Sequence, residues 1–324
     1  MCQKTTKLTL VISTIYQVIR TLRPRQWLKN ASVFAAAFFA GTFFDIDIIV
    51  LTVKAFIAFC FTSSVVYIIN DIVDAPKDRE HPTKKNRPIA SGKLSENLAW
   101  VIAIVLGVIT LFYSFTSIGT YFTLAVIFYI VMQILYSLYF RNIIIMDSLV
   151  VATGFVIRVF AGGLVSTTSI SSWLALTTIG ISLLMAFGKR RSEKTLVEKK
   201  FGLQELRTRK TLRHYPDTLL DSMISMSATY TILTYSLFTF QVSPQNISNS
   251  FASILPSILR SPKWMMLTIP LVIYGVARYL YVIYEKKEGE SPARVLLSDY
   301  PLLTVVSVWI FFVWVIIYAL PLLS

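Results

Sequence analysis

The feature that most limits the fold of this chain is a series of long apolar segments that recurs along the whole sequence. Each segment is roughly long enough to cross the ~30 Å hydrocarbon core of a bilayer. Nine such segments lie near residues 30–44, 48–69, 98–116, 119–139, 143–165, 172–187, 222–241, 264–284 and 302–322. The chain is 55% hydrophobic and only 15% charged, far more apolar than an average soluble domain. We therefore expect an all-α integral membrane protein, a bundle of nine transmembrane helices.

Basic residues are concentrated on one side of this predicted bundle. Of the 31 lysines and arginines, 26 fall in residues 1–29, 71–97, 140–147, 188–221 and 285–300. Because basic loops stay on the cytosolic side, we expect these segments and the N-terminus on the cytosolic side of the cell membrane. The C-terminus is then expected on the outer side. Residues 1–29 are predicted to be a cytosolic interfacial segment, and residues 30–324 a single transmembrane catalytic domain.

Composition excludes several kinds of site. The net charge of +14 does not imply a nucleic-acid partner, because basic cytosolic loops are usual in membrane proteins and attract anionic lipid. With only two histidines, a histidine-based metal centre or catalytic triad is not expected. The two cysteines, Cys2 and Cys60, lie far apart in the sequence and indicate neither a disulfide framework nor a thiolate metal site.

An acidic motif follows the second apolar segment. Its residues are Asn70, Asp71, Asp74 and Asp78, a spacing that can bring all four side chains to one face of a helix. Like charges placed in this way repel, and Mg²⁺ relieves the repulsion while leaving coordination positions for phosphate oxygens. We therefore predict a magnesium–pyrophosphate site, with a solvated acidic helix end as the alternative. Pro76 lies inside the motif and is expected to distort or break the helix, which could leave Asp78 on a loop.

A basic loop comes directly after the acidic motif. It contains Arg79, Lys84, Lys85 and Arg87, and its prolines and Gly92 predict a defined loop rather than a continuing helix. Arginine suits bidentate contacts with phosphate, and lysine suits a point-charge contact. Each basic residue could instead serve only to set topology, so their role as phosphate ligands is a prediction.

Further charges lie within or beside the apolar segments. Asp147 and Arg158 are eleven residues apart, which separates them by roughly 16 Å along one helix face. An ionisable residue inside a membrane is a functional candidate by default, and a structural ion pair is the alternative. Arg278 is explained by snorkelling toward the cytosolic face. A second phosphate site is predicted at Lys189, Arg190 and Arg191, which follow the sixth apolar segment.

Taken together, these motifs resemble the UbiA-type prenyltransferase superfamily, whose members form a nine-helix bundle and use Mg²⁺ to activate a pyrophosphate leaving group. Within it the chain is most similar to the branch that transfers phosphoribose to decaprenyl-type phosphates. The similar motifs are RPxQWxKN at 23–30, DRxHPxK at 78–84, RPIAxG at 87–92, YxxxFRN at 136–142, FxxR at 155–158, GKRRxE at 188–193 and DYPL at 299–302.

The resemblance implies transfer of 5-phosphoribose from phosphoribosyl pyrophosphate to a polyprenyl phosphate, as a step toward lipid-linked pentose donors for cell-envelope glycans. It implies that Asp71, Asp74, Asp78 and Asp147 are catalytic, with Asn70 and the first three holding Mg²⁺. It further implies substrate binding by Lys29, Arg79, Lys84, Arg87, Tyr136, Arg141, Arg158, Lys189, Arg190 and Arg191. A homo-oligomer is left open.

Two other functions remain at this point. An aromatic polyprenyltransferase of the same superfamily, acting for example on 4-hydroxybenzoate, usually carries DxxxD in its second motif. Here Asp147 is followed four residues later by Val151, so one carboxylate is missing. An anion transporter should show inverted repeats or broken helices near the midplane, and the sequence shows neither clearly.

Overall fold

The structure of the protein is a computed structural model, and it describes residues 2–80, 84–201, 215–242, 263–286, 295 and 298–322. All regular structure within these ranges is helical, which confirms the predicted all-α class. Seven helices are long and apolar enough to cross a membrane. The chain divides into two compact units, which are described separately: unit 1 is Met1–Ala37, Phe43–Phe140 and Ile157–Thr168, and unit 2 is Phe38–Thr42, Arg141–Val156 and Ser169–Ser324.

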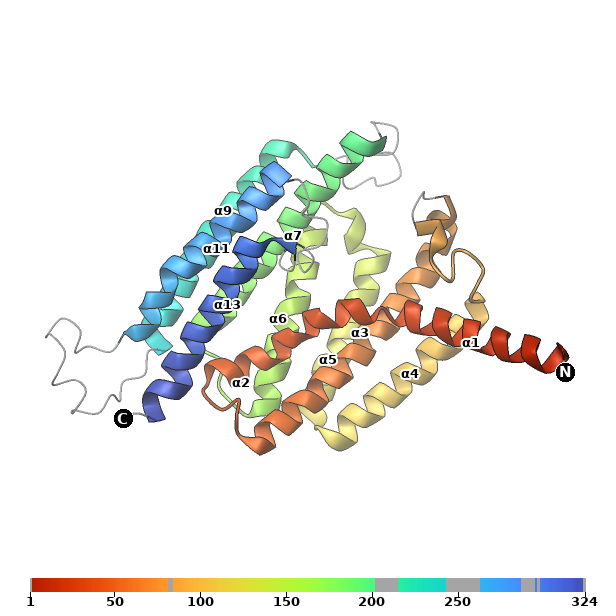
Figure 1. Cartoon of the computed structure of the whole chain (residues 1–324), viewed down its shortest axis with the longest axis horizontal. Helices are drawn as coiled ribbons and strands as arrows, with labels where there is room; N and C mark the ends of the chain where they lie inside the picture. Colours follow the sequence, from red (N-terminus) through yellow and green to blue (C-terminus); the bar gives the residue numbers. More distant parts are fainter. Residues whose placement is uncertain are drawn as a thin grey trace, which may run out of the picture. The chain divides into compact units, whose positions relative to one another are not determined.

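Unit 1 is built around one long helix, α3, which contacts α1, η1, α4 and α5 (Figure 1). Its elements are α1 (Cys2–Leu22), η1 (Pro24–Phe34), α3 (Ile46–Glu80), η2 (Lys84–Asn86), α4 (Glu96–Ser117), α5 (Thr120–Leu138) and the second half of α6 (Met146–Ser166). The start of α4 is fixed by Ser95, whose hydroxyl accepts a hydrogen bond from the Leu98 amide at 3.3 Å. Most of the predicted interfacial segment, residues 1–29, is helical in α1.

The expected break at Pro76 does not occur. Helix α3 continues through this proline to Glu80, so Asp78 lies on the helix and not on a loop. Proline removes one backbone donor and crowds the preceding turn. Pro76 is exposed, and the helix continues for four residues past it, because the loss of one backbone hydrogen bond does not end a helix that many others hold. As a result Asp71 and Asp78, two turns apart, stay on one face.

Helix α6 and the η1 segment approach each other backbone to backbone in unit 1. A Cβ atom at Gly162 would lie 1.9 Å from the Val33 carbonyl oxygen, so only glycine permits this approach. Small residues that let helices approach closely are typical of membrane bundles. Arg158 precedes Gly162 by one turn, and Asn30 lies three residues before Val33. The close approach therefore brings these two polar side chains together.

Unit 2 contains four long helices, α7, α9, α11 and α13. Helix α9 lies beside α7 and α11, and α11 packs on α13 (Figure 1). The elements are α7 (Ser172–Phe201), α9 (Asp217–Val242), η6 (Trp264–Thr268), α11 (Ile269–Tyr281), η7 (Val282–Lys286), α13 (Tyr300–Trp314), η8 (Val315–Ala319) and η9 (Leu320–Leu322). The unit also contains the last residues of α2 (Ala35–Phe39), most of η3 (Phe140–Asn142) and the first half of α6. The core of the unit includes Leu184, Phe187, Leu220, Ile224 and Ile283.

Two of the nine predicted transmembrane segments are not among the seven candidate spans. The segment near 30–44 forms part of η1 and the five-residue α2, too short to cross a bilayer. The segment near 222–241 does form a long helix, α9, but it buries several hydroxyl side chains, among them Ser227, Thr231 and Thr234. The nine-span topology therefore stays a prediction.

The start of α13 holds an ion pair that the sequence did not suggest. Arg278 of α11 donates two hydrogen bonds to Asp299, at 3.0 and 3.1 Å. Asp299 is buried and also caps α13 by accepting from the Leu302 amide at 3.0 Å. Arg278 therefore ties α11 to the first turn of α13, and its snorkelling toward the cytosolic face stays a prediction.

Gly162→Ala should destabilise the protein by about 1–3 kcal/mol, because the added methyl group forces α6 and η1 apart. The matched control is Gly107→Ala, where a Cβ would lie at an ordinary 3.8 Å from Val65. Thermal unfolding in detergent measures both variants. Equal midpoints for the two would contradict the backbone approach at Gly162.

Candidate active site

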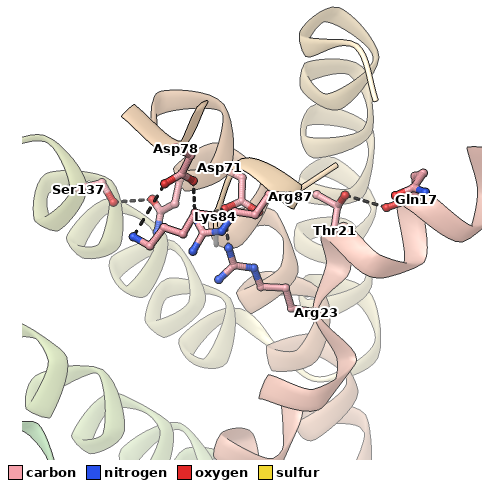
Figure 2. Close-up of polar contacts among 9 residues, drawn as sticks. Gln17, Thr21, Arg23, Asp71, Asp78, Lys84, Arg87 and Ser137 are labelled. Carbon is pink, nitrogen blue, oxygen red and sulfur yellow. Dashed lines mark hydrogen bonds and ion pairs between the residues drawn. The ribbon is translucent and has the colours of Figure 1, made fainter. Parts of the chain in front are cut away.

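The acidic motif lies at the C-terminal end of α3, in unit 1. The side chains of Asp71 and Asp78 are both buried, at 3% exposure, and point to the same cluster of cations (Figure 2). The carboxylates of Asp74 and Asp78 are close enough to act on the charge of Asp71. Of the four residues predicted to share one helix face, Asp71 and Asp78 therefore meet at one cluster, and the convergence of all four stays a prediction.

Cations from the following loop neutralise the two buried carboxylates. One guanidinium nitrogen of Arg87, Nη1, lies 3.0 Å from Oδ1 of Asp71 and 2.6 Å from Oδ2 of Asp78. The Lys84 ammonium lies 3.8 Å from Oδ1 of Asp78. A buried charge is tolerated only when it is paired in this way. Two of the predicted phosphate-binding residues thus reach the acidic motif directly.

Arg23 is a third cation at this cluster, and the list of site residues predicted from sequence omitted it. Its Nη2 lies 2.5 Å from Asp71 Oδ1, and its guanidinium stacks over the Tyr67 ring at 5.1 Å from the centroid. The residue has a φ of 54°, in the left-handed region, at the junction of α1 and η1. The RPxQWxKN motif was the signal that could have found it.

Asn70 and Arg79 have other partners. Asn70 accepts a hydrogen bond from Ser137 of α5, so its amide oxygen is directed to a neighbouring helix. Arg79 pairs with Glu96 at 2.8 Å, where both side chains are about half exposed. The structure therefore brings neither residue onto Arg87. Tyr136, next to Ser137, lies near the end of α5.

The side-chain donors of this cluster determine whether it can hold a metal ion. Among the described residues no group of three histidine, cysteine, aspartate or glutamate side chains is arranged to hold a metal ion. Asp71 and Asp78 nevertheless direct oxygen atoms at a single positive nitrogen of Arg87, which stands where a bridging cation would be held. Hard carboxylate oxygens suit Mg²⁺. The donor set fits a divalent cation once Arg87 gives up its place.

A second polar network lies deeper in unit 1, around Arg158. Its Nε donates to Asn30 at 2.7 Å and its Nη2 donates to the Tyr129 hydroxyl at 2.7 Å. Ser63 donates to the same Asn30 oxygen at 3.1 Å. Arg158 is only 5% exposed, so the predicted membrane-depth arginine is inside the protein. Asn30 and Tyr129 are further site candidates missed from the sequence.

Lys29 is the second cation of this network, next to Asn30 in η1 and outside the seven candidate spans. Burial first, and then the positive charges of Arg158 and Arg23, lower the pKa of Lys29 from its ordinary 10.5 to about 8. Cations gathered in this way repel one another. An anion bound among them would relieve that repulsion.

Of the predicted residues of unit 2, Arg190 contacts Asp147, which lies at the start of α6. This carboxylate is 2% exposed, and Nε of Arg190 in α7 lies 2.6 Å from its Oδ2. The Tyr215 hydroxyl donates to its Oδ1 at 2.5 Å and accepts a hydrogen bond from the Ile145 amide at 2.6 Å. Ile145 has a φ of 70°, which is rare for a β-branched residue. Such strain is often stored at functional sites.

The other two cations of the GKRRxE motif, Lys189 and Arg191, pair with acids other than Asp147. Lys189 lies 3.7 Å from Glu193, which also pairs with Arg190 at 2.9 Å. Arg191 instead turns to α9, pairing with Asp221 at 2.9 Å. The predicted second phosphate site thus divides between two groups of acids. Arg141 lies in η3, before α6.

These features define the class of protein: a helical membrane bundle whose buried carboxylates are paired with arginine and lysine, the side chains that commonly bind phosphate. The UbiA prenyltransferase family matches residues 30–298, and the chain belongs to this family. It is a multi-pass membrane protein.

Among curated relatives, the chain is 32% identical to "Decaprenyl-phosphate phosphoribosyltransferase" of Corynebacterium glutamicum, over 94% of this chain and 87% of the relative. It is 36% identical to the protein of the same name from Mycobacterium tuberculosis, over 69% of this chain and 74% of the relative. Among solved structures, a UbiA homolog from Archaeoglobus fulgidus bound to DMAPP and Mg²⁺ superposes with a TM-score of 0.64 at 18% identity, covering 93% of this chain and 99% of that one. This last likeness shows the fold.

Acylation of Lys29 by an amine reagent should rise with pH around a midpoint near 8, because this lysine is half neutral there. Pyrophosphate should move that midpoint upward, since a nearby anion favours the charged ammonium. Peptide-level mass spectrometry follows the reaction. Lys93, which is exposed, is the internal control. A Lys29 profile that coincides with that of Lys93 would refute the lowered pKa.

Tyr215→Phe should lower the free energy of unfolding by about 1–3 kcal/mol, because it leaves the buried Asp147 carboxylate and the Ile145 amide each short of a partner. Burial and the adjacent Asp147 raise the pKa of Tyr215 to about 12, so the hydroxyl remains a donor at neutral pH. The matched control is Tyr284→Phe. It removes a 2.9 Å bond to Asp221, which is 40% exposed and can turn to water instead. Chemical denaturation compares the two, and an equal loss contradicts the special role of Tyr215.

Proposed function

We propose that this protein transfers 5-phosphoribose from phosphoribosyl pyrophosphate to a polyprenyl phosphate of the decaprenyl type and releases pyrophosphate. The observation that carries the proposal is the likeness to decaprenyl-phosphate phosphoribosyltransferases over most of the chain. Buried carboxylates surrounded by arginine and lysine in unit 1 support it, because a donor and an acceptor that both carry phosphate need many cations.

Asp71, Asp74 and Asp78, with Asn70, are the residues proposed to hold Mg²⁺. When bound, the ion neutralises the negative charge that grows on the leaving pyrophosphate. The magnesium in the solved relative from Archaeoglobus fulgidus is consistent with this assignment. Asn70 would have to turn from Ser137 to take part.

Arg23, Lys84 and Arg87 are proposed to bind the pyrophosphate of the donor, because all three already lie at the acidic motif. Their fixed positive charge favours breaking of the bond between ribose C1 and the pyrophosphate oxygen, whose electron pair leaves with pyrophosphate. Arg79 is exposed and pairs with Glu96, and its proposed role is confined to attracting the anionic donor.

Lys29 and Arg158 are proposed to hold a further phosphate group, either the 5-phosphate of the donor or the phosphate of the lipid. An acceptor phosphate oxygen is anionic at neutral pH, so its attack on C1 needs positioning rather than a strong general base. Asp147 is assigned to holding Arg190 and Tyr215 in place. Arg141, Lys189, Arg191 and Tyr136 complete the proposed substrate-binding set.

The membrane topology is part of the proposal. Nine spans would place the N-terminus, the acidic motif and the basic loops in the cytosol, where phosphoribosyl pyrophosphate is available, and the C-terminus outside. The bilayer would hold the polyprenyl chain of the acceptor. A cell membrane location and a role in cell-envelope glycan synthesis follow from the same assignment.

The rival function is prenyl transfer from a polyprenyl pyrophosphate to an aromatic acceptor. Val151 stands where the second carboxylate of the usual DxxxD motif is expected, and Asp147 is engaged with Arg190 and Tyr215. Both features favour the phosphoribosyl transfer over the rival.

The proposal is tested by incubating the purified protein in detergent with Mg²⁺, radiolabelled phosphoribosyl pyrophosphate and decaprenyl phosphate. Label should move into the organic phase. Asp71→Asn should lower the rate on the order of 100-fold or more, because the site loses a charge that acts in the transition state.

Glu80→Gln is the matched control, since this exposed acid lies at the end of the same helix and should keep normal turnover. A parallel incubation with polyprenyl pyrophosphate and 4-hydroxybenzoate tests the rival. Label that stays in the aqueous phase while hydroxybenzoate is prenylated overturns the proposal in favour of the rival.

A further inference from the structure

Arg87 occupies an unusual position in the acidic motif, because a single nitrogen serves both buried carboxylates. Its Nη1 lies 3.0 Å from Asp71 and 2.6 Å from Asp78, and no other cation printed in Figure 2 bridges these two residues. A divalent cation held by Asp71 and Asp78 needs the oxygen atoms that now face this nitrogen. The guanidinium and the metal ion therefore compete for one place.

The backbone around Arg87 is anchored while its side chain is not enclosed. The Arg87 amide donates to the Lys84 carbonyl at 2.9 Å, and the Leu94 amide donates to the Pro88 carbonyl at 3.0 Å. Ile89 and Leu94 are buried in the core formed with α3 and α4. The Arg87 side chain is 26% exposed. Rotation of this side chain can therefore exchange its partners without displacing the loop.

Three cations, Arg23, Lys84 and Arg87, already face the two buried carboxylates Asp71 and Asp78. A divalent cation added alone would bring two further positive charges to this partly buried site, which is costly. Pyrophosphate offsets these charges, and its oxygens match the planar donor geometry of a guanidinium better than a single carboxylate oxygen does.

We propose that Arg87 is the exchangeable cation of this site, moving from Asp71 and Asp78 to the phosphate oxygens as metal and pyrophosphate bind. The inference rests on the proposed function only in requiring a pyrophosphate ligand. Because coupling between two ligands is reciprocal, pyrophosphate tightens metal binding and the metal tightens pyrophosphate binding to the same degree. Arg87 thus makes the site accept the two ligands as a unit.

The test measures metal binding directly and does not depend on turnover. Mn²⁺ is titrated into the full-length protein in detergent, with and without inorganic pyrophosphate, and free Mn²⁺ is followed by electron paramagnetic resonance against a protein-free titration that accounts for the Mn²⁺ bound by pyrophosphate in solution. The wild-type protein should bind Mn²⁺ about tenfold more tightly when pyrophosphate is present. Arg87→Met should bind Mn²⁺ alone about tenfold more tightly than the wild type, with most of the coupling lost.

The matched control is Lys93→Met, which removes one positive charge from the same loop at an exposed position and should behave as the wild type. If Arg87→Met does not fold, Arg87→Lys is used, whose ammonium bridges two carboxylates less well and should show a smaller gain in Mn²⁺ affinity. Unchanged or weaker Mn²⁺ binding in the folded Arg87 variant, with the coupling retained, overturns the inference. A wild-type protein that shows the coupling between Mn²⁺ and pyrophosphate but does not transfer phosphoribose to lipid would instead overturn only the proposed function.

Discussion

The pairing of buried carboxylates with arginine is the interaction on which this structure depends. Asp71, Asp78 and Asp147 are each at most 3% exposed in a chain dominated by apolar helices. Desolvated charges of this kind are stable only with partners that satisfy them, and removal of one partner leaves a strongly destabilising charge behind. Each of these acids is paired with a guanidinium from outside its own helix: Asp71 and Asp78 with Arg87, and Asp147 with Arg190. The charge pairs therefore fix how helices and loops meet at the site.

The same pairs make the chemistry plausible. A site meant for pyrophosphate must contain cations to hold phosphate and carboxylates to hold metal, and these attract one another. Unit 1 keeps both kinds of group in one cluster, with Arg87 between Asp71 and Asp78. The stability of the site and the binding of ligand thus depend on the same side chains. Stability and function are linked because Arg87 can pair either with the two carboxylates or with the phosphate oxygens of a ligand.

Close backbone packing supplies the second constraint. Gly162 lets α6 approach η1 so closely that Arg158 reaches Asn30 and, on another side, Tyr129. A guanidinium inside a membrane protein needs such polar partners, and Asn30 and Tyr129 come from two segments far apart in the sequence. The absence of a side chain at Gly162 thus permits the contact between Arg158 and Asn30.

The sequence by itself determined the helical membrane class, the acidic motif at the end of α3, and the basic loop that follows it. Long apolar runs and charge spacing on a helix depend only on local periodicity, so these features could be predicted. Pro76 misled the prediction, because the loss of one backbone hydrogen bond did not end a helix that many others hold. The partners of the charges were decided by tertiary structure alone: Arg23 on Asp71, Tyr215 on Asp147 and Arg278 on Asp299. These pairs join residues up to 68 positions apart. Which charges meet over such distances depends on how helices pack, and local sequence patterns carry no record of that packing.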